Sequence, residues 1–350
     1  MAQRFSIVAS FFLLCIFSIP VSVNAQFDPL QISNSLTLSI SPRASSPGAN
    51  VTIVADSSFL DLSLSEIEWF VNGKVVLRGT GKTTLNTVAG ALGTKALIEV
   101  TATTPEGTTA AGEISIRPGE VDLLFDSDSY VPPFYRGRAL PSAGTTLRLQ
   151  AIVHFQKTDG SLVPENAILY TWKRRGQILS QVSGRGKSSV SIPAPSLFSS
   201  DLISVEVQSA DGEFSGTASA PIDSTDPFVA LYEDHPLFGI TYGREIGAQK
   251  SVSGSEITLA AVPFFAEASR PDDENLLYEW TVNNVPVVAS SSKKNEIVAS
   301  AGPSNRGAGI QVQISHAKNF FMSVTGRWAI LFSSASAGPG AKKNVFESSE

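Results

Sequence analysis

The sequence predicts an all-β protein of three tandem antiparallel β-sandwiches that follow an N-terminal export signal. Three observations support this prediction. A tryptophan motif recurs three times, and apolar residues alternate with polar ones on both sides of each tryptophan. No stretch after the signal has the i, i+3, i+4, i+7 apolar spacing of an amphipathic helix. Short alternating segments between turn residues are typical of antiparallel sandwiches, in which each strand buries one face.

Residues 1–25 have the features of a secretory signal peptide. Arg4 supplies the basic start, and Val23-Asn24-Ala25 fits a small-x-small cleavage site. Between them, Phe5 to Ile19 is an almost unbroken apolar run, shorter than the roughly 20 residues of a membrane span. The alternative is an uncleaved anchor. We expect cleavage, with no membrane span in the mature chain, and a location in the periplasm or at the cell surface.

Composition excludes several classes of function. The one cysteine, Cys15, lies inside the signal, so the mature domains must depend on apolar cores without disulfides. The absence of cysteine from the mature domains fits a bacterial exported protein. The formal net charge of −6 argues against a broad basic surface for nucleic acid. Three histidines and one cysteine leave little material for a zinc site or a cysteine nucleophile.

The tryptophan motif predicts a β-hairpin at the centre of each unit. Trp69, Trp172 and Trp280 are 103 and 108 residues apart. An apolar residue stands two positions before each tryptophan, and Gly or Asn stands four positions after it. Gly and Asn tolerate the positive φ of a tight turn, and apolar residues resume after each one. We therefore expect the three indoles to be equivalent parts of three cores.

Two further strands flank each predicted hairpin. The upstream strand alternates in every unit, and so does the downstream strand. The spacing from the tryptophan to the central valine of the downstream strand is 31, 33 and 32 residues. The upstream set is Val51, Ile53, Ala55; Leu147, Leu149, Ala151; and Ile257, Leu259, Ala261, and the downstream set is Ile98, Val100, Ala102; Ile203, Val205, Val207; and Ile310, Val312, Ile314.

A tryptophan strand between two such strands resembles the B, C and F strands of an immunoglobulin-like domain, or of the related PKD-type domain. In the immunoglobulin family this tryptophan packs on a B–F disulfide, and aliphatic residues would take its place here. The tyrosine-corner position holds Ile in each unit, and the Gly-Asp-Gly signature of PKD domains is missing. The resemblance implies immunoglobulin-like sandwiches over 35–117, 118–223 and 224–334. Residues 335–350 are small and polar, and we expect them to form a disordered tail.

Units two and three carry an insertion, rich in proline and aromatic residues, that unit one lacks. Leu124 to Tyr135 aligns without gaps to Leu231 to Tyr242. One interpretation is that the aromatic residues pack on their own sandwich or fill the joint to the preceding unit. The other is an interaction surface, because aromatic residues on loops are common binding anchors. The candidates are Phe134, Tyr135, Phe238 and Tyr242.

Two strings resemble a phosphate-binding loop, Gly79-Thr80-Gly81-Lys82-Thr83 and Gly184-Arg185-Gly186-Lys187-Ser188. Both lack the glycine that a P-loop needs five residues before its Gly-Lys, and no helix is predicted after either. Gly81 lies 12 residues after the tryptophan of its unit, and Gly186 lies 14 residues after the tryptophan of its own. We therefore interpret them as equivalent loops of one repeat and expect no nucleotide cofactor.

No catalytic or metal constellation is predicted. The sequence has no Gly-x-Ser-x-Gly elbow, and its histidines fall at non-equivalent places in the units. The acidic clusters, Asp126 with Asp128 and Asp272-Asp273-Glu274, lack the 12-residue pattern of a calcium loop. We interpret them as solvated turn charge, with calcium binding that rigidifies the rod left open. The basic run Lys173-Arg174-Arg175 is expected at a hairpin tip facing water, with binding of an anionic glycan or lipid left open.

These features predict a non-catalytic exported cell-envelope protein. It would be a modular rod for adhesion, scaffolding or protein–protein interaction, with other envelope or surface proteins as partners. The alternative is a glycan-binding module that uses the loop aromatic residues. The last apolar stretch, Phe320 to Phe332, is expected to form the final strand of unit three, with Trp328 partly buried.

Overall fold

The structure is a computed structural model that describes residues 35–289, 293–301 and 307–333. The expected signal peptide and C-terminal tail lie outside these residues. Within the described ranges the chain is all-β, and its single helical element is the three-residue 3-10 turn η1 (Glu165–Ala167). No helix in these ranges has the length and apolar character needed to cross a membrane.

The first sandwich packs a three-stranded sheet on a four-stranded sheet, all antiparallel. Eight residues connect β1 to β2, without the longer insertion of the second sandwich. The first sheet is β1 (Thr37–Ser41), β2 (Asn50–Asp56) and β5 (Thr84–Val88); the second is β4 (Lys74–Thr80), β3 (Glu66–Val71), β6 (Ala96–Thr103) and β7 (Thr109–Ile116).

The second sandwich repeats this plan with a longer connection between its first two strands. Strand β12 (Gly184–Arg185) pairs β10 beside the hairpin partner β11. The first sheet is β13 (Ser189–Pro193), β9 (Thr146–His154) and β8 (Glu120–Ser127); the second is β11 (Gln177–Ile178), β10 (Ile168–Arg174), β14 (Ser200–Ser209) and β15 (Ser215–Asp223).

The third sandwich divides its N-terminal region between both sheets. Strand β16 joins the first sheet, and β18 then pairs parallel with the last strand of the second. The first sheet is β17 (Gly239–Ile240), β16 (Phe228–His235), β19 (Glu256–Phe264) and β22 (Glu296–Ser300); the second is β18 (Gln249–Ser253), β24 (Ser323–Ser333), β23 (Gly307–His316), β20 (Leu276–Val282) and β21 (Val285–Val287).

The three tryptophans occupy the same place in the three sandwiches. Each is buried on the first strand of its hairpin. Their direct cross-strand partners are Val100, Val205 and Val312, the central valines of the downstream strands. Each indole Nε1–H donates to a lysine carbonyl, at 2.7 Å for Lys82, 2.8 Å for Lys187 and 3.1 Å for Lys294. A buried indole therefore has its polar group satisfied in every unit.

These contacts explain the two strings that resemble phosphate loops. Gly79 and Gly184 have φ of 150° and 145°, and Gly81 and Gly186 both have φ of 69°. The shared backbone conformation turns the following lysine carbonyl toward the indole of the same unit. The two strings are thus equivalent tryptophan-binding loops.

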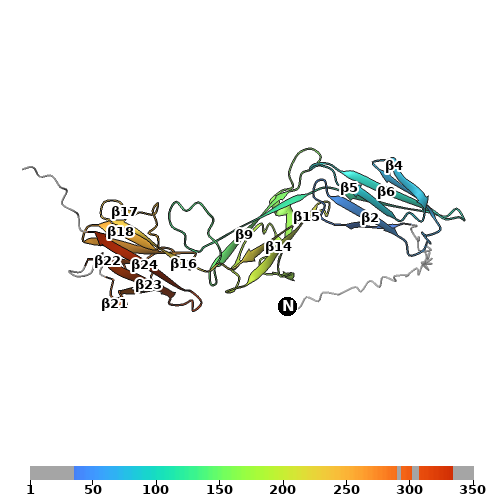
Figure 1. The fold of residues 1–350 in the computed structure, drawn as a ribbon. Coiled ribbons are helices and arrows are strands. Elements are labelled where there is room, and N and C mark those ends of the chain that lie inside the picture. The colour runs from blue at the N-terminus through green and yellow to red at the C-terminus, as the bar shows by residue number, and fades with distance from the viewer. Residues whose placement is uncertain (1–34, 290–292, 302–306, 334–350) are drawn as a thin grey trace, which may run out of the picture.

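The sandwiches follow one another along an elongated molecule (Figure 1). Three residues separate β7 from β8, and four separate β15 from β16. At the first joint, the Gly119 N–H donates to the Ser45 carbonyl at 3.0 Å. Arg117 lies 3.1 Å from the Glu213 carboxylate and over the Phe214 ring. The linkers leave little slack, so contacts between neighbouring sandwiches set their relative orientation.

Two details of the sequence-based predictions are wrong. The alignment equates Leu124 with Leu231. In the structure Leu231 pairs with Ala261, whereas the equivalent Ala151 pairs with Leu123, one position before Leu124. A shift of one residue reverses the face of the strand, which is why Leu124 is exposed while Leu231 is buried. The final strand also begins at Ser323, so Phe320 precedes it.

Candidate interaction surface

The segment 128–145, between β8 and β9 of the second sandwich, crosses to the third sandwich. The Tyr130 N–H donates to the Ala266 carbonyl at 2.8 Å, and the Phe265 N–H donates back to the Tyr130 carbonyl at 2.7 Å. The Ser142 hydroxyl donates to the Phe265 carbonyl at 2.6 Å. The insertion of unit two therefore packs on the following unit.

This segment covers an apolar face that a sandwich ordinarily leaves in water. Alternate residues of β16 and β19 point away from the core of the third sandwich, yet they are buried. Tyr130, Val131 and Leu140 pack on them and close a separate apolar cluster between the two sandwiches. The buried members from the third sandwich are Ala230, Tyr232, Val262, Phe264 and Phe265.

Tyrosine hydroxyls lie at the margin of this cluster. Burial raises the pKa of Tyr130, and its hydrogen bond and proximity to Tyr242 raise the pKa further. Tyr242 in turn packs on the Tyr232 ring at 5.6 Å. The Tyr130 hydroxyl therefore stays protonated at physiological pH and acts as a hydrogen-bonding group within the joint.

The loop between β23 and β24 makes a second connection to the second sandwich. The Asn319 side-chain amide donates to the Ala143 carbonyl at 2.7 Å and to the Glu267 carboxylate at 2.8 Å. His316 Nδ1 accepts the Asn319 N–H at 2.8 Å and the Lys318 N–H at 3.2 Å. The His316 ring thus contacts the backbone of the loop at two successive residues.

Asp273 shapes the neighbouring loop between β19 and β20. Burial alone would raise the pKa of its carboxyl, but hydrogen bonds from Ser269 and Asn275 outweigh burial and lower the pKa to about 2. The Ser269 N–H lies 3.0 Å from Oδ2 and the Asn275 N–H lies 3.0 Å from Oδ1. The charged carboxylate holds the two ends of this loop segment together.

The loop between β13 and β14 contacts the linker to the third sandwich, where the Ser224 N–H donates to the Ser199 carbonyl at 2.9 Å. Buried Asp201 forms ion pairs with both Arg174 and Arg175, and Lys173 pairs with Glu206 at 2.5 Å. The carboxylates of Asp201 and Glu206 thus offset two of the three positive charges of the basic run at the hairpin tip, and the Arg175 side chain stays 60% exposed. These pairs also secure the backbone next to Phe198.

Three phenylalanines on these loops are almost fully exposed. The exposed fraction is 92% for Phe134, 83% for Phe198 and 94% for Phe320. Phe134 and Phe198 also have positive φ, at 68° and 57°. A bulky residue is rarely found in this region and pays a conformational cost there. Among the described residues, this conformational cost at Phe134 and Phe198 is offset by little burial of their side chains.

The sequence candidates fall into two separate places. Phe134 and Tyr135 lie at the joint, where Tyr135 is 39% exposed and makes edge contacts with Phe264 and Phe265 at 5.8 and 6.0 Å. Phe238 is 78% exposed and stacks on His235, at the opposite end of β16. The four residues therefore do not form one compact group.

Sequence reasoning missed Phe198, Phe320 and its neighbour Phe321. Phe320 and Phe321 stand before the alternation of β24 begins at Val324, which was a signal that they lie on a loop. Phe198 stands among serines in a segment without periodicity, and no pattern in the sequence marks it as exposed.

The joint contains no sign of a metal centre. Among the residues that the structure describes, no three or more His, Cys, Asp or Glu side chains are arranged to hold a metal ion. The chemistry available at the surface is apolar contact from phenylalanine rings, together with hydrogen bonds from the loops that hold them.

Comparisons with known proteins give fold-level likeness. No protein-family model and no curated protein matches the chain. Three N-terminal domains of the bacteriophage RB49 outer capsid protein Hoc are 12% identical, covering 86% of this chain and 99% of that one, with a TM-score of 0.27. The central fibronectin-III array of RIM-binding protein is 11% identical, covering 85% and 96%, with a TM-score of 0.29. Bacteroides ovatus SGBP-B, solved with a mixed-linkage heptasaccharide, is 17% identical, covering 83% and 65%, with a TM-score of 0.23.

Proposed function

We propose that this chain is a non-catalytic exported rod of the cell envelope that binds a partner protein at the joint between its second and third sandwiches. The observation that carries the proposal is the exposure of Phe134, Phe198 and Phe320 on loops fixed by hydrogen bonds and ion pairs. Exposed aromatic side chains on a rigid support are favourable anchors because little conformational entropy is lost on binding.

The rigidity of the joint supports a scaffolding role. Segment 128–145 couples the second sandwich to the third through backbone hydrogen bonds and a shared apolar cluster. We propose that the rod comprises sandwiches over 35–117, 118–223 and 224–334, exported by a signal peptide over 1–25. Adhesion or scaffolding then depends on a partner that recognises the aligned pair of sandwiches.

Glycan binding through loop aromatic residues is the weaker candidate. It would need Phe134, Tyr135, Phe238 and Tyr242 to form one exposed row, and Tyr242 is instead packed on Tyr232. Tyr135, next to Phe134, lies at one end of β16, and Phe238 lies at the other end. A partner protein can contact the joint without reaching Phe238.

Site-specific photo-crosslinking tests the proposal. Benzoylphenylalanine replaces Phe134, Phe198 or Phe320, one at a time, in the chain expressed in its own envelope. Because the replacement keeps an aromatic ring, the local chemistry changes little. The proposal predicts the same cross-linked partner protein from at least two of the three positions.

Two exposed positions in the first sandwich provide the control. Leu64 is 62% exposed and Val88 is 60% exposed, and neither lies at the joint. Benzoylphenylalanine at these positions should not capture the same partner. Absence of cross-links at all three phenylalanine positions, or equal capture from Leu64 and Val88, would contradict the proposal.

A further inference from the structure

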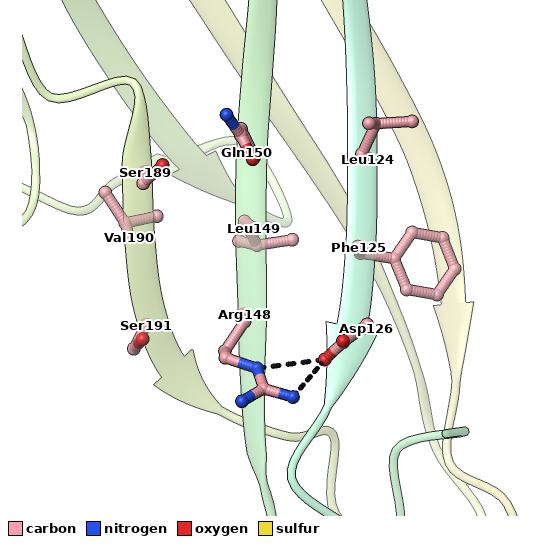
Figure 2. Close-up of a pocket in the computed structure, with 9 residues that line it drawn as sticks. All are labelled: Leu124, Phe125, Asp126, Arg148, Leu149, Gln150, Ser189, Val190 and Ser191. Atoms are coloured by element: carbon pink, nitrogen blue, oxygen red, sulfur yellow. Dashed lines mark hydrogen bonds and ion pairs between the residues drawn. The ribbon is translucent and has the colours of Figure 1, made fainter. Parts of the chain in front are cut away.

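A second feature, separate from the joint, is a groove on the outer face of the sheet β13–β9–β8. It has a volume of about 450 Å³, and all of its lining residues come from these three strands. Figure 2 shows that Arg148 and Asp126 meet at one end, with Gln150, Ser189 and Leu124 along the other. The strand register aligns the side chains in two rows.

The two rows cross all three strands. In one row Asp126 pairs with Arg148, which pairs with Ser191; in the other Leu124 pairs with Gln150, which pairs with Ser189. Strands in a sheet are about 4.8 Å apart, and residues two positions apart on a strand are about 6.7 Å apart. The rows thus present a patch of hydrogen-bonding groups the size of a short oligosaccharide.

Much of the hydrogen-bonding capacity of this patch is unused. Arg148 donates from Nε and Nη2 to Asp126 Oδ1, at 2.9 and 2.7 Å, and from Nη2 to the Ser127 carbonyl at 3.1 Å, so these bonds do not use Asp126 Oδ2 or Arg148 Nη1. The side chains of Gln150, Ser189 and Ser191 have no partner among the residues that the structure describes. Together these groups offer both donors and acceptors.

The other two sandwiches do not offer this patch at the equivalent positions. In the first, Thr52 stands in place of Arg148 and donates to Asn86, in place of Ser191, at 2.8 Å. In the third, Ala260 stands in place of Gln150, and Tyr232 in place of Leu124 is buried at the joint. The open polar rows are therefore particular to the second sandwich and are not required by the fold.

The chemistry of the patch selects the class of ligand. The one carboxylate and the one guanidinium cancel, so the lining has no net charge to attract an anion. Hydroxyl groups, which both donate and accept, suit the mixture of donors and acceptors in the rows. Half-exposed Leu124 adds an apolar surface for the C–H face of a sugar ring. We infer that this groove binds a neutral oligosaccharide.

Binding of the mature chain to an array of neutral and acidic oligosaccharides, followed by calorimetry on the best neutral one, tests the inference. Arg148→Ala and Gln150→Ala each remove a predicted contact from an exposed face. Loss of a hydrogen bond to a charged group should weaken binding about tenfold or more for Arg148→Ala. Gln150→Ala should weaken it several-fold. Ser189→Ala with Ser191→Ala is a second, milder variant that leaves the ion pair in place.

Thr52→Ala with Asn86→Ala, at the equivalent place in the first sandwich, is the matched control and should bind as the wild type does. Phe134→Gly should also bind normally, so failure of the joint proposal and failure of this one are distinguishable. The inference is overturned by a wild-type chain that binds no neutral oligosaccharide. It is equally overturned by neutral binding that survives both Arg148→Ala and Gln150→Ala, or by preference for acidic oligosaccharides.

Discussion

The Ser142 hydroxyl of the second sandwich donates to the Phe265 carbonyl of the third at 2.6 Å, across 123 residues of sequence. Phe265 has a positive φ of 56° and is buried, so its carbonyl direction is set by an unusual backbone. The two sandwiches are therefore joined by buried polar contacts as well as by apolar packing. Disruption of this joint should therefore destabilise the strands of the third sandwich that it covers.

Tyr130→Ala should loosen the joint. The change removes a ring from the cluster that covers β16 and β19, and burial of such a side chain contributes about 2 kcal/mol. Hydrogen exchange in β16 and β19 should become faster, while exchange in the first sandwich should not change. Leu64→Ala, at an exposed position of the first sandwich, is the control. Unaltered exchange in β16 would show that the segment adds nothing to the third sandwich.

Phe134→Gly and Phe198→Gly should each raise the melting temperature. Glycine adopts positive φ without the cost that an L-residue pays, roughly 1 kcal/mol, and little packing is lost at side chains as exposed as these. Phe320 is also exposed but is not among the positive-φ residues, so Phe320→Gly should give no gain. Calorimetric melting of the three variants measures the difference. A lower melting temperature for Phe134→Gly and Phe198→Gly would mean that their backbone conformation is not costly.

Trp172→Ala should destabilise the second sandwich by about 3–5 kcal/mol, because a large buried side chain leaves a cavity. Trp172→Phe should cost about 1–3 kcal/mol, since the Lys187 carbonyl loses its indole donor. Guanidinium unfolding, followed by hydrogen exchange of the backbone amides in β10 and β14 of the second sandwich, provides the measurement. An unchanged unfolding midpoint for Trp172→Ala would contradict the burial of this indole.

Acid should weaken the loop that Asp273 holds. The folded pKa of its carboxyl is about 2, below the ordinary value of 3.8. The stabilisation is therefore fully present above about pH 4 and is lost as the pH falls toward 2, where the carboxylate binds its proton. Carbon-13 NMR of the Asp273 carboxyl group checks the pKa directly. A midpoint near 3.8 would show that the hydrogen bonds from Ser269 and Asn275 do not persist in solution.

The repeated core was predictable because its signals are local. Alternation with period two, and a tryptophan at constant spacing from a valine, specify strand, face and partner at once. The observed pairing of Trp69 with Val100 follows from these signals. The same logic failed where the alignment was shifted by one residue at Leu124, because that shift exchanges the buried face for the exposed one.

The joint was not predictable from the sequence. Segment 128–145 has no period, and its contacts with Phe265 and Ala266 join residues more than a hundred positions apart. Positive φ at phenylalanine has no sequence signal, since this conformation is normally reserved for Gly and Asn. Phe134 was therefore proposed from its residue type alone, and Phe198 was missed.

The affinity of the cross-linked partner for the joint is the most direct measurement of the central claim. Once that partner is purified, its dissociation constant is measured with the wild-type chain and with the variant that combines Phe134→Gly, Phe198→Gly and Phe320→Gly. The account predicts binding about 100-fold weaker or more, with the sandwiches still folded. Equal affinity of the folded triple variant and the wild type would contradict the account.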